Sequence, residues 1–380
     1  MEKWVRPSSF HLQWHITEKC NFNCRHCYRR DYERELSTKD LFLVLHQYIE
    51  LIRMWELDKN NRPRKLSISG GEPLLREDVF ELLGEIKRNR EMFTSLVLTS
   101  NGSTITRGAA KRLKNFAISA VQISLEGTEN VNDNIRGEGS FEKALKGVEN
   151  LMNADIPIGV SITVSKENHR DVENLIDLLV DMGVKYIGVS RYVPIGNDPA
   201  IKILEPRELK DFFSRIMKER RELLGRNVYL STHCSDSLWF IEDRNHETHG
   251  CSAGYDSFSI LPNGDVVPCR RLPIKVGNVL EKTLLDIWYT SDFLWKLRDK
   301  GRIKKCHQCE LFRLCFGGAR CIACGYFNDP FAPDPQCWKL FKSLPDRSMK
   351  FGVSAKKKVF NKMYLQRFEV QRYFEHMVNV

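Results

Sequence analysis

Residues 10–224 alternate short apolar runs with longer segments of helical apolar spacing, and this alternation limits the folds open to the chain. The short runs are rich in Val and Ile, which favour strands, and the longer segments repeat apolar residues as amphipathic helices do. Strand–helix units in succession predict an α/β fold whose parallel sheet curls into a partial barrel. The expected strands are 10–16, 65–69, 95–99, 120–125, 158–164 and 186–193, and the expected helices are 40–55, 78–88, 141–152, 171–183 and 205–224.

Several of the expected strands end in Gly, Asn or charged residues. Gly70–Gly71, Asn101–Gly102 and Glu126–Gly127 stand at three such ends, and "EKCNFNCRHC" follows the first strand. Because the carboxyl ends of parallel strands share one edge of the sheet, where ligands bind, we expect these segments to converge. The sequence therefore predicts a site at this edge.

The twelve cysteines are unevenly distributed: three lie at 20–27 and nine at 234–337. The N-terminus "MEKWVRPSSF" lacks the apolar core of a secretory signal, so we expect the cytoplasm, where thiols stay reduced. In that compartment clustered cysteines indicate metal sites instead of disulfides. The distribution predicts two metal-bearing regions separated by a scaffold.

Cys20, Cys24 and Cys27 have the spacing C-x3-C-x2-C. Three close thiolates can hold three irons of a 4Fe–4S cluster and leave the fourth iron open to a small molecule. The alternative is a structural zinc site with a distant fourth cysteine. Zinc sites usually show C-x2-C pairs twice, so this spacing fits zinc poorly.

The net charge of +10 suits either an anionic partner or a solvated basic surface. No run approaches the roughly 20 apolar residues of a membrane helix, so we expect no membrane span. We predict no nucleic-acid partner.

The C-terminal part of the chain has a different pattern. "FSILPNGDVVPC", residues 258–269, predicts a hairpin with Asn263–Gly264 as its turn pair. Loops with cysteines follow, as in a small domain held by metal. A basic tail contains "KKK" at 356–358 and an aromatic stripe that we expect to dock on the parent protein, with a membrane or partner role as the alternative. The stripe is Phe360, Tyr364 and Phe368, and the predicted divisions are 1–225 (core barrel), 226–250 (linker), 251–342 (metal-bearing domain) and 343–380 (tail).

The first cysteine loop resembles that of the radical SAM superfamily, whose members place CxxxCxΦC after the first strand of a partial (β/α)6 barrel. Cys20, Cys24 and Cys27 fill the motif, and His26 takes the Φ position. The resemblance implies that S-adenosylmethionine (SAM) binds the open iron of a 4Fe–4S cluster. Its reductive cleavage would yield a 5′-deoxyadenosyl radical that abstracts a hydrogen atom.

Other strand-end segments carry the resemblance further. "SGGEPLL" resembles the GGE motif, whose backbone and glutamate bind the SAM amino group, and "NDNIRG" resembles the segment whose arginine contacts the SAM carboxylate. "TSNG", "ISLEG" and "ITVSKEN" match the ends of the third, fourth and fifth strands, the last lining the ribose or adenine pocket. The cofactor-binding residues implied are Gly70, Gly71, Glu72, Ser124, Glu126, Arg136 and His26.

The C-terminal cysteines resemble the SPASM domain, an extension of many radical SAM enzymes that modify peptides. Its C-x(9–15)-G-x4-C pattern fits Cys251, Gly264 and Cys269. Its C-x2-C-x5-C-x3-C pattern begins at Cys306, but Ala319 stands in place of the fourth cysteine. "GNVLEKTLLDIW" also follows the usual text of the family.

The resemblance implies two auxiliary 4Fe–4S clusters. The fourth ligand of the first cluster stays open between Cys321, Cys324, Cys234 and an iron without a protein ligand. Zinc remains an alternative here, because C-x2-C pairs also suit it. One cluster would use Cys251, Cys269 and a cysteine of the pair Cys321 and Cys324, and the other would use Cys306, Cys309, Cys315 and Cys337.

The sequence therefore predicts a radical SAM enzyme, and we expect a peptide or protein substrate and an electron donor such as ferredoxin or flavodoxin. One alternative is a cofactor-biosynthesis enzyme that acts on a tetrapyrrole or metallocofactor. Another is a non-catalytic iron–sulfur electron carrier or zinc-stabilised binding module, against which the SAM-site motifs argue, since an electron carrier needs no SAM pocket. No residue is singled out as a catalytic acid or base.

Overall fold

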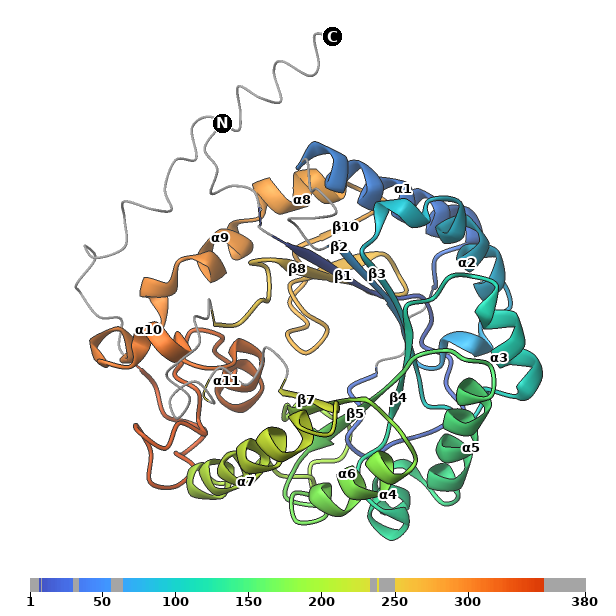
Figure 1. Ribbon diagram of the computed structural model, residues 1–380. Helices are drawn as coiled ribbons and strands as arrows, with labels where there is room; N and C mark the ends of the chain where they lie inside the picture. Colours follow the sequence, from blue (N-terminus) through green and yellow to red (C-terminus); the bar gives the residue numbers. More distant parts are fainter. Residues whose placement is uncertain are drawn as a thin grey trace, which may run out of the picture.

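The computed structural model describes Pro7, residues 9–29, 34–55 and 64–232, Leu238, and residues 250–351. These residues form one ten-stranded sheet in the order β10-β9-β8-β1-β2-β3-β4-β5-β6-β7. The sheet is curved, and Figure 1 shows helices along its outer side. The strands are β1 (Phe10–His15), β2 (Arg64–Ser69), β3 (Ser95–Ser100), β4 (Ala120–Ser124), β5 (Ile158–Val164), β6 (Tyr186–Arg191), β7 (Tyr229–Thr232), β8 (Ser257–Ile260), β9 (Asp265–Val267) and β10 (Gly277–Asn278).

The helices fall into an outer layer that belongs to the barrel and a smaller C-terminal group. Helix α1 begins with a capping box, in which the Ser37 hydroxyl accepts from the Asp40 backbone N–H and the Asp40 carboxylate accepts from the Ser37 N–H. The outer helices are α1 (Thr38–Met54), α2 (Val79–Arg88), α3 (Arg107–Lys114), α4 (Glu129–Arg136), α5 (Ser140–Met152), α6 (Val172–Asp181) and α7 (Pro206–Leu224). The C-terminal helices are α8 (Leu284–Thr290), α9 (Asp292–Arg298), α10 (Phe312–Cys315) and α11 (Arg320–Phe327).

The predicted parallel α/β barrel is confirmed. All six expected strands form, and each pairs in parallel with the next. The structure adds helices α3 and α4 and a seventh parallel strand, β7, which pairs with β6. Because β7 lies at 229–232, part of the range assigned to the linker belongs to the sheet; the domain bounds otherwise stay predictions.

The two faces of the barrel sheet differ in chemistry. On the outer face, apolar residues such as Leu12, Leu66 and Val121 pack with the helices in one continuous core. The register places the alternate residues on the inner face, where polar or small side chains predominate. Toward the carboxyl ends of strands β1–β8, none of the strand residues on this inner wall is charged. Representative members are Gln13, Ser67, Gln122, Ser124, Ser161 and Ser190.

The C-terminal region is continuous with the barrel. Strand β8 pairs in parallel with β1, and the predicted hairpin of β8 and β9 is confirmed with Asn263–Gly264 in its turn. An ion pair also joins the regions: Arg191 Nη2 of β6 lies 2.9 Å from Asp334 Oδ2, and both side chains are at most 2% exposed. The C-terminal region is therefore built onto the barrel through backbone pairing and a buried charge pair.

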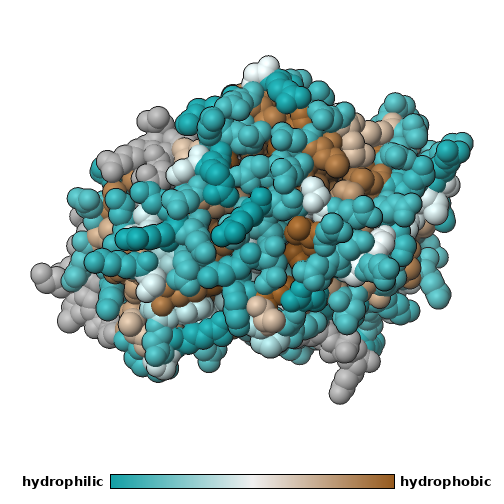
Figure 2. All heavy atoms as spheres, turned by 90° about the horizontal axis from the view of Figure 1, so that it is seen from below, coloured by the Kyte–Doolittle hydropathy of each residue, from teal (hydrophilic) through white to brown (hydrophobic). Residues whose placement is uncertain are grey.

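No helix in the described ranges is long and apolar enough to cross a membrane. Figure 2 shows one face of the molecule, on which hydrophilic residues predominate and apolar residues form scattered patches. The KKK segment and the aromatic stripe of the predicted tail lie outside the described residues.

Candidate functional site

The first cysteine loop is held at the carboxyl edge of the sheet by backbone contacts from two sides. The Arg25 N–H donates to the Ile135 carbonyl of α4 at 2.9 Å. The Asn197 N–H, after β6, donates to the Cys27 carbonyl at 2.9 Å. The Arg25 guanidinium also pairs with Asp198 at 2.8 Å. Contacts within the protein therefore fix the position of the loop backbone.

Each sulfur of this loop has an N–H donor. Asn101 Nδ2 lies 3.9 Å from Cys20 Sγ, Arg136 Nη1 lies 4.0 Å from Cys24 Sγ, and the backbone N–H of Arg29 lies 3.4 Å from Cys27 Sγ. Burial, helped by the nearby Cys27, Glu126 and Cys20, raises the pKa of Cys24 to about 11, and Arg136 opposes this shift. N–H groups directed at thiolate sulfur tune the reduction potential of an iron–sulfur cluster.

The glycine pair after β2 is required by close backbone approach. The Gly71 N–H donates to the Thr17 carbonyl at 2.7 Å, and the Glu72 N–H donates to the Lys19 carbonyl at 2.8 Å. A Cβ on Gly70 would lie 2.4 Å from the Thr17 oxygen, and one on Gly71 would lie 2.3 Å from the Lys19 oxygen. Side chains at these positions would therefore separate β2 from the start of the cysteine loop.

The carboxylate of Glu72 is turned into the protein. It is fully buried and accepts from the Ser100 hydroxyl at 3.0 Å, the Asn101 N–H at 2.8 Å and the Thr104 hydroxyl at 3.1 Å. These bonds fasten the end of β2 to the turn after β3. In this arrangement Glu72 supports the turn that carries Asn101, and a direct contact of its side chain with SAM stays a prediction.

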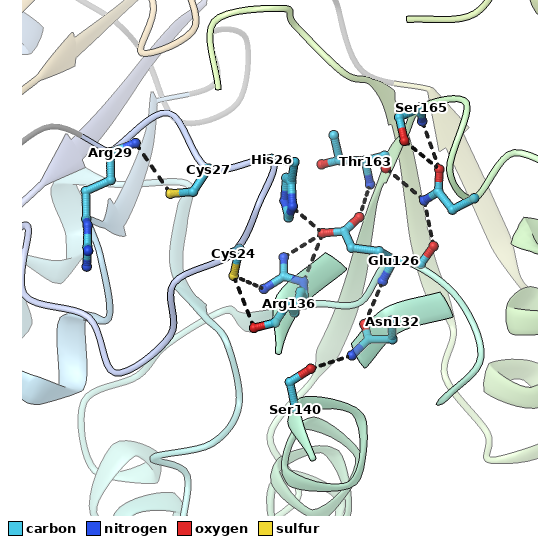
Figure 3. Close-up of polar contacts among 11 residues, drawn as sticks. Cys24, His26, Cys27, Arg29, Glu126, Asn132, Arg136, Ser140, Thr163 and Ser165 are labelled. Atoms are coloured by element: carbon cyan, nitrogen blue, oxygen red, sulfur yellow. Dashed lines mark hydrogen bonds and ion pairs between the residues drawn. The ribbon is translucent and has the colours of Figure 1, made fainter. Parts of the chain in front are cut away.

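Glu126, Arg136 and His26 form one buried network beside Cys24 (Figure 3). Arg136 donates to Glu126 Oε1 at 2.6 Å, His26 Nε2 lies 3.3 Å from the same oxygen, and the Thr163 N–H donates to Glu126 Oε2 at 2.6 Å. Burial acts to raise the pKa of Glu126, but Arg136 and His26 outweigh it and hold that pKa below its usual value. The carboxylate is therefore ionised and holds Arg136 against the cysteine loop.

The structure thus brings the predicted cofactor-binding residues to one edge of the barrel. Ser124 lies half-buried at the end of β4, two residues before Glu126. Among the described residues, His26 Nδ1 is buried with no hydrogen-bond partner. Three converging thiols, each with an N–H donor, and an unsatisfied ring nitrogen beside them fit an iron–sulfur cluster with a polar small molecule.

Four C-terminal cysteines surround a single cavity. Its volume is about 70 Å³, and Cys306, Cys309, Cys315 and Cys337 line it together with apolar side chains. Burial raises the pKa of both Cys306 and Cys337 to about 12, and neighbouring thiols contribute to each shift. The four thiols expected to hold one auxiliary cluster are therefore grouped in space.

A second group contains Cys251, Cys269 and Cys321. Burial raises the pKa of Cys321 well above its usual value, and the nearby Cys269 and Cys251 thiols raise it further. Cys324 is one turn later on α11, and within the described residues the charged group that acts on its pKa is Asp329. All four thiols belong to one packing cluster, and the electrostatic influence of Cys251 and Cys269 on Cys321 leads us to favour it over Cys324 as the third ligand. Cys234 lies outside the described residues.

The spacing of the thiols bears on the zinc alternative. Zinc–sulfur bonds are about 2.3 Å long, so the sulfurs of a zinc site approach one another to roughly 4 Å. In the described part of the chain no three His, Cys, Asp or Glu side chains are close enough to hold a single metal ion. Thiols spread around a cavity instead fit a polynuclear cluster.

A thiol loop after the first strand of a parallel barrel, with further thiol groups in a C-terminal region, defines a class of iron–sulfur enzymes. The chain belongs to the radical SAM superfamily: residues 14–179 match the model of the Radical SAM superfamily. Residues 251–310 match the SPASM model, described as an iron-sulfur cluster-binding domain. The cofactors of the protein are SAM and a 4Fe–4S cluster in the barrel, and auxiliary iron–sulfur clusters in the C-terminal region.

Curated relatives match most of the chain. It is 28% identical over 354 residues to the AdoMet-dependent heme synthase of Methanosarcina barkeri, covering 86% of this chain and 95% of the relative. It is 30% identical over 346 residues to the mycofactocin maturase MftC of Mycolicibacterium smegmatis, covering 86% and 82%. The crystal structure of Streptococcus suis SuiB bound to S-adenosylmethionine has the same fold, with a TM-score of 0.69 at 20% identity, over 88% of this chain and 77% of that one.

Several residues of the site carried no signal that sequence reasoning used. Asn101 was expected at the carboxyl edge of the sheet but not as a donor to Cys20 sulfur, and Arg29, whose backbone N–H donates to Cys27 sulfur, was not among the predicted site residues. Arg270 and Glu18 form a buried ion pair at 2.8 Å across 252 positions of sequence. No sequence spacing relates two residues so far apart, so their pairing can be seen only in the folded structure.

The grouping of Cys321 leads to a prediction on the first auxiliary cluster. Cys321→Ala is expected to lower bound iron by about four per chain, or to change the EPR signal of one cluster, because it removes a ligand. Cys324→Ala, one helical turn away, is the matched control and should leave iron and spectra unchanged. Iron analysis and EPR of anaerobically reconstituted protein provide the measurement. The reverse pattern would assign the ligand to Cys324.

Proposed function

We propose that the enzyme abstracts a hydrogen atom from a peptide or protein substrate that enters the barrel. In this proposal Cys20, Cys24 and Cys27 hold the cluster that binds SAM, and the SAM pocket is lined by residues at the strand ends. The protein orients the substrate carbon and excludes water, while the cofactor supplies the radical chemistry. The proposed pocket residues are Gly70, Gly71, Glu72, Ser124, Glu126, Arg136 and His26.

The observation that carries the peptide proposal is the chemistry of the inner wall. Toward the carboxyl ends of the strands, the inner wall carries neutral side chains that both donate and accept hydrogen bonds, such as those of Ser124 and Ser161. A peptide backbone presents the same uncharged donors and acceptors. An anionic tetrapyrrole presents several carboxylates, which proteins recognise best with Arg and Lys.

Relatives with maturation functions support the same proposal. The mycofactocin maturase MftC has 30% identity, and the sporulation killing factor maturation protein SkfB of Bacillus subtilis has 24% identity over 305 residues. We further propose an electron donor such as ferredoxin or flavodoxin, since SAM cleavage is reductive. A reducing compartment, the cytoplasm, suits the eleven described cysteines, all of which are free thiols.

The second candidate is a tetrapyrrole substrate. Relatives named AdoMet-dependent heme synthase and Fe-coproporphyrin III synthase, both from Methanosarcina barkeri, match 86% of the chain at 28% and 26% identity. The positive net charge of +10 also suits an anionic substrate.

The two candidates are separated by turnover. Anaerobic, reduced enzyme with SAM is incubated with synthetic peptides encoded beside its gene, and in parallel with coproporphyrin III. We expect stimulated 5′-deoxyadenosine and a defined change in peptide mass, such as a loss of about two mass units for one hydrogen pair. Omission of SAM is the control. Turnover of the porphyrin together with indifference to every peptide would refute the peptide proposal.

A further inference from the structure

His15 is a buried polar residue that is not among the proposed SAM-pocket residues. It is the last residue of β1, its side chain is 3% exposed, and the described residues provide no hydrogen-bond partner for Nδ1 or Nε2. An unsatisfied buried polar group lowers the stability of the folded protein. In native structures such a group is normally completed by a bound water, an ion or a ligand.

His15 lies on the inner wall of the barrel. In the parallel register it is opposite Ser69 of β2, in the same alternation as Gln13 and Ser67. This places it at the carboxyl edge of the sheet, five residues before Cys20. Figure 1 shows β1 and β2 side by side on the inner side of the helix layer.

His11 shows what a satisfied histidine on this wall looks like. It is four residues earlier on the same strand and the same face, and its Nε2 is hydrogen-bonded to Ser67 Oγ at 2.8 Å. The two histidines share strand and face, although His11 is half-buried and His15 is buried. Among the described residues, a hydrogen-bond partner exists for His11 and not for His15. His11 therefore provides a matched control for His15.

The His15 ring is neutral. Burial lowers its pKa well below the usual value, and the positive charge of Arg270 lowers it further. A neutral imidazole has one N–H donor and one acceptor nitrogen. A peptide group likewise carries one N–H and one carbonyl, whereas a carboxylate carries acceptors alone.

We infer that His15 is a substrate-contacting residue whose imidazole hydrogen-bonds the backbone amide groups of a peptide inserted into the barrel. The inference rests on the proposed function and deepens it by naming the contact and its chemistry. One ring nitrogen donates to a substrate carbonyl and the other accepts from a substrate N–H. The partners are missing from the protein because the substrate supplies them.

The test uses three variants of the reconstituted, SAM-loaded enzyme without reductant. His15→Phe keeps a ring of similar size but has no hydrogen-bonding atom, His15→Gln restores one donor and one acceptor, and His11→Leu is the matched control. The probes are fluorescein-labelled synthetic peptides of the proteins encoded beside the gene, with coproporphyrin III as a second probe. Binding is measured by fluorescence anisotropy for the peptides and by absorbance for the porphyrin.

We expect His15→Phe to weaken binding of a peptide by about 5- to 150-fold, the range given by one or two lost hydrogen bonds to a buried group. His15→Gln should bind within about threefold of wild type, and His11→Leu should bind as wild type does. Equal iron content in all variants shows that they are assembled. Should His15→Phe fail to fold, His15→Leu replaces it.

The possible failures are distinguishable. If a peptide binds wild type and His15→Phe equally well, the inference is wrong and the proposed function stands; a bound water then completes the ring. If coproporphyrin III binds wild type and no peptide does, the proposed function is wrong and the inference is lost with it.

Discussion

In the triple variant Cys20→Ala, Cys24→Ala, Cys27→Ala, production of 5′-deoxyadenosine from SAM is expected to fall to the level measured without enzyme. The three thiols are grouped on one loop, and each has its own N–H donor. Removing them removes every protein ligand proposed for this cluster. The product is measured by liquid chromatography after anaerobic reduction with dithionite.

Iron analysis shows whether the loss is local. We expect bound iron to fall from about twelve to about eight per chain, since the auxiliary clusters are proposed to use C-terminal cysteines as their ligands. Cys324→Ala, the control variant, should retain SAM cleavage. If the triple variant still forms 5′-deoxyadenosine, this loop is not where SAM is cleaved.

The second large effect is expected for Arg191→Leu. Arg191 and Asp334 form an ion pair that is almost fully buried, and Asp334 also accepts from the Ala319 N–H at 2.9 Å. Removing the cation leaves a buried carboxylate without its counter-charge, which costs about 3–5 kcal/mol. We therefore expect a marked loss of stability and faster hydrogen exchange around α11, measured anaerobically by guanidinium denaturation and mass spectrometry.

An exposed pair offers the matched control. Arg215 Nε lies 2.6 Å from Glu173 Oε1, with side chains 45% and 27% exposed. Arg215→Leu should cost less than about 1 kcal/mol, because water screens exposed pairs. Equal losses from the two variants would show that the Arg191–Asp334 pair has no special role in joining the two regions.

The barrel could be predicted because its signal is local. The barrel strands are short runs in which buried apolar residues alternate with less buried ones, and the outer helices repeat their apolar residues regularly. Helix α4 was not predicted because its sequence, ENVNDNIR, is mostly polar, and only three of its eight residues are buried. Strand β7 was not predicted because its sequence, YLST, has four residues. A segment this short shows no clear apolar periodicity.

The site divides in the same way. Cysteine spacing and glycine turns are local and could be identified in the sequence, whereas the partners of those residues are not. Cys321 and Cys324 are three positions apart on α11, and spacing does not say which of them meets Cys251 and Cys269. The orphaned ring of His15 is likewise invisible in the sequence, because a histidine in an apolar run is usually satisfied by its neighbours, as His11 is by Ser67.

The pairing of β8 with β1 has a consequence for synthesis of the chain. Strand β1 leaves the ribosome with one edge open, and the strand that covers it starts at residue 257. At about 5–20 residues per second, the roughly 240 intervening residues take about 12–50 s to translate. During that interval β1 presents unpaired N–H and carbonyl groups beside the loop that holds three thiols. Because the β1–β8 pairing joins residues so far apart in the sequence, we expect it to form late in folding, with β1 needing protection from other chains until then.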